Sequence, residues 1–450
     1  MKAMKWMTSV AVMMGLLAMR SAQAATYYLD VNSTTNGSGI VEGGSYAVSG
    51  TYWTTTAAGT GTLVNYVDRN SMVFAAGTDA TGLNYTITGS ISQPNLISIE
   101  EGIVTLAATW SAYSSPTIRT ADGTSLAITG SNDFYGRIIP FDTIGSSTIT
   151  LNSISTTSGR RGGVLKTGTG TLIVQNAASA RGIDVFVTNG IMRIQNGNAM
   201  FVPAYPNNGY AAMVTTNGTL ALENNINVAN TALSLCGFGY NGLGVLNNYA
   251  GTNQYTWPDA ITLKGDTRIN ASAGQLTFAK GFFTNNYILV FGGAGVLIVS
   301  NAIHTGTGSL IKVDTGDLTL AGTNSYSGYT LVSNGTVSVK GTLATAKVTV
   351  SAPATLTGSG TLHWNPGEVV TVLGALDITQ MNMVLHASDA LPAGDTVIVD
   401  YSSSGSTLTG STFANVNRDE IASESKLVYD TGLKKIVLRT PPRGTMISFH

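Results

Sequence analysis

Short apolar pairs at alternating positions run along most of the chain. Examples are Leu172 and Val174, Leu276 and Phe278, and Val337 and Val339, each pair separated by one residue. Alternation with a period of two over three to five residues, bounded by Gly, Asn and Ser, is typical of short strands with one buried face. Because such pairs come in close succession, the pattern predicts an all-β chain built from many short strands.

Two short motifs recur between these apolar pairs. The string Gly-x-Gly-(Thr/Ser)-Leu begins at Gly59, Gly168, Gly306 and Gly358, and Asn-Gly precedes an apolar strand at Asn189, Asn217 and Asn334. Asn-Gly readily adopts the positive-φ conformations that a sharp corner needs. One short strand cannot bury its apolar face alone, so neighbouring repeats must stack and share a core. The pattern predicts a parallel β-helix with coils of about 20 to 25 residues and a cap at each end.

Charged residues are scarce. The 23 Lys+Arg and 24 Asp+Glu make up 10% of the 450 residues, while Gly contributes 53; an ordinary soluble domain carries about a quarter of charged residues. A formal net charge of -1 leaves no basic surface to neutralise phosphates, so we expect no nucleic-acid partner. The four His and single Cys lack the spacing of a zinc site, and we expect no metal and no cofactor. Cys236 is expected to be a small buried apolar residue.

The segment from Gly316 to Val337 closely resembles the autotransporter-associated β-strand repeat, also called the passenger-associated transport repeat. The positions that carry this resemblance are Gly316, Leu318, Leu320, Gly322, Asn324, Tyr326, Gly328, Thr330 and Gly335. A looser copy from Gly162 to Ile194 keeps the Gly-Thr-Leu and Asn-Gly elements but lacks the Asn-Ser-Tyr-x-Gly centre. The resemblance implies a right-handed parallel β-helix outside a bacterial cell, in a family associated with secretion of passenger domains. Only Arg439 to His450 come after the last predicted strand, so we expect no autotransporter barrel.

The order of segments predicts an exported protein. Residues 1–24 have a basic start, an apolar run and the small-residue ending of a signal peptide, and after its removal we expect no membrane span. Residues 25–75 form an aromatic-rich cap with the first coils, and residues 76–374 form the β-helix, with repeats near 162–194 and 306–343. Residues 375–440 supply the last coils and a cap, with a short helical turn near 418–424, and residues 441–450 form a tail.

Aromatic residues interrupt the regular pattern between residues 205 and 257. The candidates for binding a glycan or a protein partner are Tyr205, Tyr210, Tyr240, Tyr249, Tyr255 and Trp257, with Phe238 among them. Loops that project from a solenoid often bind ligands, and aromatic rings stack on sugars. Packing between coils explains the same residues, and both interpretations stay open.

Parallel β-helices also include polysaccharide lyases and hydrolases, which need clustered carboxylates. The closest acidic pairs are Asp314 with Asp317 and Asp259 with Asp266, and turn capping explains both pairs better than catalysis. We therefore assign no catalytic residue. The sequence favours an exported, non-enzymatic structural or adhesive passenger-like protein, at the cell surface or in the medium, with the periplasm as another location. Its expected partners are an extracellular glycan or surface protein and the secretion machinery. The alternative is a carbohydrate-active β-helix enzyme.

Overall fold

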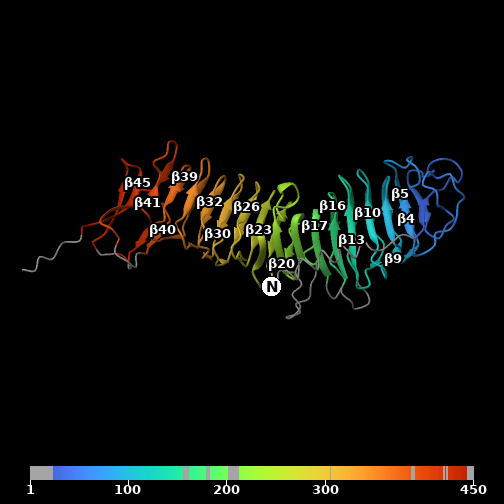
Figure 1. The fold of residues 1–450 in the computed structure, drawn as a ribbon, viewed down its shortest axis with the longest axis horizontal. Helices are drawn as coiled ribbons and strands as arrows, with labels where there is room; N and C mark the ends of the chain where they lie inside the picture. Colours follow the sequence, from blue (N-terminus) through green and yellow to red (C-terminus); the bar gives the residue numbers. More distant parts are fainter. Residues whose placement is uncertain are drawn as a thin grey trace, which may run out of the picture.

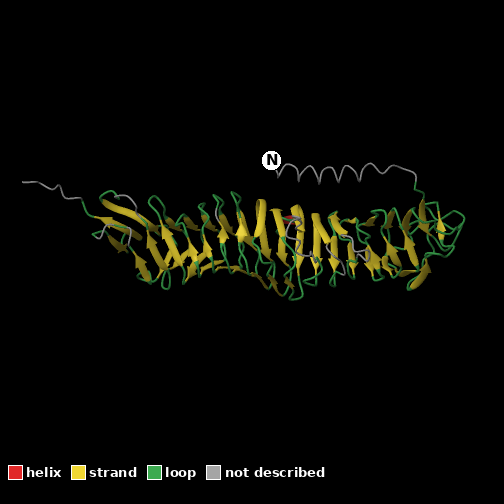
Figure 2. Cartoon of the chain, turned by 90° about the horizontal axis from the view of Figure 1, so that it is seen from below, coloured by secondary structure: helices red, strands yellow, loops and turns green. Residues whose placement is uncertain are grey.

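The computed structural model describes residues 24–155, 162–178, 183–200, 212–304, 306–386, 391–418, 421 and 424–442. In these residues the chain is a parallel β-helix, and Figures 1 and 2 show its coils stacked along one long axis. The predicted all-β, parallel β-helical fold is confirmed. Almost all of the expected signal peptide, Tyr205, Tyr210, most of the expected turn at 418–424 and most of the tail lie outside the described residues.

Each regular coil contributes one strand to each of three faces, which we call the first, second and third face. The first face contains β1 (Thr26–Leu29), β4 (Ser71–Phe74), β7 (Leu96–Ile99), β10 (Thr117–Thr120), β13 (Ile138–Thr143), β15 (Gly162–Thr167), the first halves of β17 (Ile183–Ile194) and β18 (Ala212–Leu222), β20 (Leu233–Gly237), the first half of β23 (Ile261–Ala271), β25 (Phe282–Phe283), β28 (Ile303–His304), β31 (Thr323–Asn324), β34 (Thr342–Leu343), β37 (Thr361–Trp364), β40 (Asn382–Leu385) and β43 (Asn415–Asn417).

The second face begins after the first corner of each coil. It contains β2 (Gly44–Ala47), β5 (Asn84–Thr88), β8 (Ile103–Leu106), β11 (Ser125–Ile128), β14 (Thr148–Leu151), β16 (Thr171–Val174), the second halves of β17 and β18, β21 (Leu246–Asn248), the second half of β23, β26 (Leu289–Gly292), β29 (Leu310–Lys312), β32 (Thr330–Val332), β35 (Val348–Val350), β38 (Val370–Val372) and β41 (Gly394–Asp400).

The third face closes each coil and leads into the next. It contains β6 (Ser90–Ser92), β9 (Thr109–Ser111), β12 (Asn132–Asp133), β19 (Asn227–Val228), β22 (Thr252–Tyr255), β24 (Gln275–Phe278), β27 (Val296–Val299), β30 (Asp317–Leu320), β33 (Thr336–Val339), β36 (Thr355–Gly358), β39 (Ala375–Asp377) and β42 (Thr407–Thr409). The only helical element in the described part is a 3-10 turn, η1 (Tyr240–Gly242). No helix among the described residues is long and apolar enough to cross a membrane.

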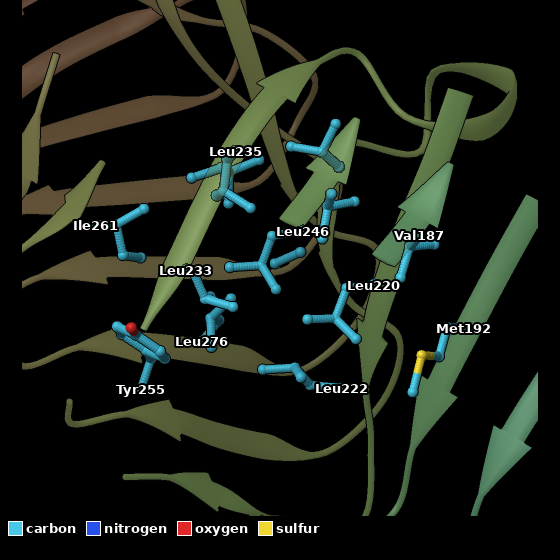
Figure 3. Packing of buried hydrophobic residues seen from close by; sticks show 14 of the residues in the cluster. Val187, Met192, Leu220, Leu222, Leu233, Leu235, Leu246, Tyr255, Ile261 and Leu276 are labelled. Carbon is cyan, nitrogen blue, oxygen red and sulfur yellow. The ribbon is translucent and has the colours of Figure 1, made fainter. Parts of the chain in front are cut away.

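The core is a column of apolar side chains inside the coils. On the third face Leu297 pairs with Leu318 and Leu318 pairs with Val337, and all three side chains are fully buried. Figure 3 shows how leucines and other apolar residues from successive coils point toward one another. Because strand side chains alternate between the two sides of a sheet, the period-two pattern places the same apolar positions inside every coil.

Coil length varies along the axis. The pairs Leu297–Leu318 and Leu318–Val337 place coils 21 and 19 residues apart. The pair Leu235–Leu263 spans 28 residues, since the loop that contains η1 projects between them. Extra residues therefore leave the coil as loops, while the paired strands keep their register.

Two of the three Asn-Gly corners have the expected conformation. Gly190 and Gly335 both have a φ of 69°, in the left-handed region. Gly218 pairs with Gly190 at the corner inside β18 but is not among the positive-φ residues, so the prediction of a positive φ at Asn217-Gly218 is wrong. There an added Cβ would lie 2.2 Å from the carbonyl oxygen of Val187. Gly218 is needed for this close approach of two coils, rather than for its backbone angle.

Antiparallel strands are found at both ends of the β-helix. At the N-terminal end β3 (Trp53–Thr54) pairs with β1, and at the C-terminal end β45 (Lys435–Thr440) pairs with both β41 and β44 (Lys426–Asp430). At the C-terminal end, Arg439 on β45 donates two hydrogen bonds to the carboxylate of Asp395, at 2.7 and 2.8 Å. These strands cover part of the parallel edges that would otherwise pair with another chain.

Candidate functional site

The strict repeat positions have structural roles in the described coils. Leu318 and Leu320 are fully buried, and Tyr326 is buried with its hydroxyl sharing a 2.6 Å hydrogen bond with Thr330. Asn324 accepts a hydrogen bond from the Ile303 amide at 3.1 Å and donates to the carbonyls of Gly322 and Thr342, both at 3.0 Å. One amide side chain therefore links three successive coils.

The repeat glycines allow close contact between coils. A Cβ on any of them would lie between 2.1 and 2.3 Å from a backbone atom of the preceding coil; they are Gly316, Gly322, Gly328 and Gly335. Real Cβ atoms do not approach backbone atoms so closely, so alanine at these positions would push adjacent coils apart.

Two buried lysines each lie at a corner of the β-helix, and the sequence analysis did not predict their burial. Lys312 is fully buried, and its Nζ donates to the carbonyls of Val313 at 2.6 Å, Asp314 at 2.7 Å and Asn334 at 3.3 Å. The first two carbonyls belong to its own corner and the third to the next coil. The buried ammonium group thus has three backbone acceptors, as a buried charged donor requires.

The segment from Gly162 to Ile194, which the sequence predicts as a looser copy, contains the same lysine corner. Lys166 is fully buried, and its Nζ donates to the carbonyls of Thr167 at 2.5 Å, Gly168 at 2.8 Å and Asn189 at 3.0 Å. Burial lowers the pKa of Lys166 to about 7 and that of Lys312 to about 8. The signal was present in the sequence, because both lysines precede a Gly-(Thr/Asp)-Leu strand by the same interval and an Asn-Gly pair by one coil.

The predicted aromatic residues do not form one surface. Tyr255 is fully buried, donates from its hydroxyl to the Thr231 carbonyl at 2.8 Å and points into the core in Figure 3. Tyr240 precedes β21, Tyr249 comes directly after it and Trp257 comes after β22, so these three side chains lie at three different corners of the coil. Tyr255 therefore cannot bind a partner at the surface, and Trp257 is half-buried against the core.

A partly exposed aromatic and polar cluster lies instead around Tyr249. The Tyr249 side chain is 44% exposed, and the Arg193 guanidinium lies 4.1 Å from the centre of its ring. Arg193 and Gln195 both donate hydrogen bonds to the carboxylate of Glu223. We call these four residues the Tyr249 cluster. Its residues come from three successive coils, so their closeness in space could not be predicted from their distance in the sequence.

One member of each acidic pair that was considered for catalysis has structural partners. Asp314 has a φ of 57°, and its Oδ2 accepts from Arg268 at 2.5 Å and from the Gly293 amide at 2.8 Å. Asp266 accepts from the Ile288 amide at 2.9 Å. Among the described residues, no group of three or more His, Cys, Asp or Glu side chains is arranged to hold a metal ion.

Cys236 is only partly buried, because it lies at an outward-facing position of β20. The expectation of a small buried apolar residue is therefore wrong. Burial, together with the smaller effect of the nearby charge of Asp266, raises the pKa of its thiol. A raised pKa disfavours the reactive thiolate, so Cys236 is poorly suited to act as a nucleophile.

The comparisons with known proteins agree with the repeat geometry. A family model described as Passenger-associated-transport-repeat matches residues 310–339, which begin at β29 and end with β33. The chain is also similar to the "Adhesin BmaC autotransporter" of Brucella suis biovar 1 (strain 1330), with 27% identity over 257 residues that cover 56% of this chain and 7% of that protein. No solved structure matches the chain. Residues 310–339 of this β-helix are thus a passenger-associated transport repeat, as the resemblance over Gly316 to Val337 predicted.

Proposed function

We propose that this protein is an exported, non-enzymatic β-helical rod that acts as a structural or adhesive passenger at the cell surface. The observation that carries the proposal is the passenger-associated transport repeat within a parallel β-helix, together with the similarity to an autotransporter adhesin. A rod of stacked coils extends a surface away from its attachment point and presents loops along its whole length.

The Tyr249 cluster is the proposed contact for a glycan partner. Its exposed ring offers a surface for a sugar, and the Arg193 guanidinium, held by the buried Glu223 carboxylate, lies 4.1 Å from the ring centre and fixes the position of the ring. Aromatic faces combined with a few oriented polar groups are typical of specific binding sites.

Two experiments test this proposal. The first is protease accessibility of a tagged native protein on intact cells, with periplasm, outer surface and medium fractionated. Surface exposure supports the rod, and a pool confined to the periplasm contradicts it. The second is glycan-array binding of the purified chain, in which Tyr249→Ala should lose at least tenfold in affinity. Tyr329→Ala is the matched control, since Tyr329 is 45% exposed on another coil. Equal loss in both variants would contradict the assigned contact.

A carbohydrate-active enzyme remains the alternative from another functional class. Asp314 and Asp317 are the pair to test, because they flank the corner before β30. Release of products from a panel of polysaccharides, abolished in Asp317→Asn but retained in Asp122→Asn, would favour the enzyme over the adhesive rod.

A further inference from the structure

The N-terminal end of the β-helix contains a buried carboxylate oxygen without a partner. Asp30 comes directly after β1 and is fully buried. Its Oδ1 accepts hydrogen bonds from the amides of Asn32 at 2.9 Å and Ser33 at 3.2 Å. Its Oδ2 is buried and has no hydrogen-bond partner. A buried unpaired carboxylate oxygen is costly, so a group that supplies positive charge or a donor is needed at this point.

A second unpartnered oxygen lies on the same loop. Asn32 Oδ1 is also buried without a partner. The loop that begins at Asp30 closes through a 2.7 Å hydrogen bond from the Val31 amide to the Ser38 carbonyl. A Cβ on Gly39 would lie 2.6 Å from the Cβ of Asn32, so glycine allows the end of the loop to fold back onto Asn32.

Asp79 brings a second carboxylate to this loop from a distant part of the chain. Its Oδ1 accepts from the Ser38 amide at 2.6 Å and the Ser38 hydroxyl at 2.7 Å, and its Oδ2 accepts from the Gly39 amide at 3.0 Å. Burial, with a further contribution from the charge of Asp79, raises the pKa of Asp30 despite the two amides that donate to it. None of the ion pairs among the described residues involves Asp30 or Asp79.

We propose that Asp30 Oδ2, Asn32 Oδ1 and the carboxylate of Asp79 form a site for a hard divalent cation, Ca²⁺, at the N-terminal end of the β-helix. Carboxylate and amide oxygens are the ligands that Ca²⁺ prefers, and its flexible coordination accepts water in the remaining positions. The proposed ligands are two aspartates and one asparagine. This set has fewer than the three His, Cys, Asp or Glu side chains of the metal-binding groups considered above, none of which is found among the described residues. Its ligand set resembles weak extracellular sites, with dissociation constants of about 10⁻⁴ to 10⁻³ M.

The site lies where a cation would also strengthen the end of the fold. The Asp30 amide donates to the Tyr52 carbonyl at 2.9 Å, and the Gly37 amide donates to the Ala58 carbonyl at 2.9 Å. Ca²⁺ would therefore join Asp79 to the loop after β1, which these two hydrogen bonds connect to residues on either side of β3. Ions that bind only the folded state raise its stability as their occupancy increases.

The first test is calorimetric titration of the purified full chain with CaCl₂ and, separately, MgCl₂ after removal of metal with EDTA. We expect saturable binding of one Ca²⁺ per chain, weaker binding of Mg²⁺ and a higher melting temperature with Ca²⁺. Tb³⁺ supplies a local readout, because Trp53 pairs with Leu29 next to Asp30 and would sensitise its luminescence. Ca²⁺ should quench that signal by competition.

The matched variants are Asp30→Asn, Asp79→Asn and the control Asp122→Asn. Asp122 accepts from the amide and hydroxyl of Ser146 at 2.7 and 2.8 Å, as Asp79 accepts from Ser38, but the unpartnered oxygen that precedes the Ser146 loop, Thr143 Oγ1, is a neutral hydroxyl and not a carboxylate. We expect the first two variants to bind Ca²⁺ at least tenfold more weakly and the control to bind as the unmodified chain does. Asp79 is exposed, so its variant reports on binding even where Asp30→Asn fails to fold.

Three outcomes would overturn the cation site. The unmodified chain could show no saturable Ca²⁺ binding, as expected if water alone fills the position. Both site variants could bind as tightly as the control. The melting temperature could rise on acidification and not with Ca²⁺, as expected if a proton on Asp30 replaces the ion. The site does not depend on the proposed adhesive function, and each can fail without the other.

Discussion

The repeat at residues 310–339 and the segment predicted as its looser copy share a lysine corner, but this corner lies between different faces of the β-helix. Lys166 lies at the end of β15 on the first face, whereas Lys312 ends β29 on the second face. Both side chains nevertheless donate to two carbonyls of their own corner and one of the next coil. The comparison shows that the lysine corner can form at two different corners of a coil, since its hydrogen bonds involve only two adjacent coils.

The two copies differ in the segment after the corner. The strict copy uses Asn324 to link three coils and Tyr326 to bind Thr330 in the core. The looser copy lacks this centre in its sequence, although the lysine and the positive-φ glycine are retained. The shared corner should therefore account for more stability than the centre that only one copy has.

The largest effect is expected for Gly335→Ala. The residue has a φ of 69°, and a Cβ would lie 2.3 Å from the Gly316 carbonyl oxygen. Backbone strain and overpacking together should cost about 4 kcal/mol in unfolding free energy, measured by urea denaturation. Gly190→Ala should reduce the unfolding free energy by a similar amount. Gly367→Ala is the control, because Gly367 has a φ of 87° and nothing lies near its Cβ position. Equal costs at positions 335 and 367 would contradict the close approach of coils.

Replacing the buried lysines should have the second largest effect. Lys312→Met and Lys166→Met each remove the donor from three carbonyls at a corner, at a cost of about 3 kcal/mol. The costs should be similar in the two copies, as measured by urea denaturation. Lys340→Met provides the comparison at an exposed lysine and should change stability by less than about 0.5 kcal/mol. A cost confined to one of the two copies would show that their corners are not equivalent.

The centre of the strict copy should contribute less. Tyr326→Phe removes the 2.6 Å hydrogen bond with Thr330 but keeps the ring in the core. We expect a loss of about 1 kcal/mol in thermal unfolding, as for one neutral hydrogen bond. Tyr329→Phe, at an exposed tyrosine, should have almost no effect. A loss as large as that of Lys312→Met would reverse the ranking of corner and centre.

The smallest effect distinguishes the two lysines by pH. The pKa of Lys166 in the folded chain is about 7, that of Lys312 is about 8, and an unfolded lysine titrates near 10.4. Between pH 7 and 8 the folded chain releases a proton mainly from Lys166 that the unfolded chain keeps, so stability rises with pH. The gain from Lys166 should be under about 1 kcal/mol over this interval.

Urea denaturation at both pH values checks this difference. Lys166→Met should lose most of the rise between pH 7 and 8, whereas Lys312→Met should keep most of it. Asp142 lies near Lys166, and Asp314 and Asp317 lie near Lys312, so these carboxylates must stay unchanged in both variants. An unchanged rise in Lys166→Met would assign it to another group.

Much of the fold, and less of the candidate site, could be predicted from the sequence. The alternation at Leu318 and Leu320 predicted which side chains face inward, and the Asn-Gly pairs predicted the corners at Gly190 and Gly335. The lysines were missed because a charged residue is expected at the surface unless its partners are known. Those partners are backbone carbonyls, one of which belongs to the next coil. Every residue has a backbone carbonyl, so the residue types in the sequence do not reveal these partners.

The site residues show the limit most directly. Tyr255 and Tyr249 are close in the sequence and both resemble surface aromatics, yet the first is buried and the second is exposed beside Arg193. Likewise, Asp79 reaches the loop of Asp30 only because two distant segments meet at the end of the rod. These contacts depend on coil length and loop size, which the period-two pattern does not specify.

The short strands, sharp corners and stacked repeats of this chain could be predicted from its sequence, because each results from side-chain alternation and local backbone preference. The tertiary structure alone decided which edge each repeat occupies, which polar groups are buried and which residues meet across coils. Neighbours in a solenoid are separated by about one coil of chain, and any loop inserted between them changes that separation while the hydrogen-bonded register stays the same.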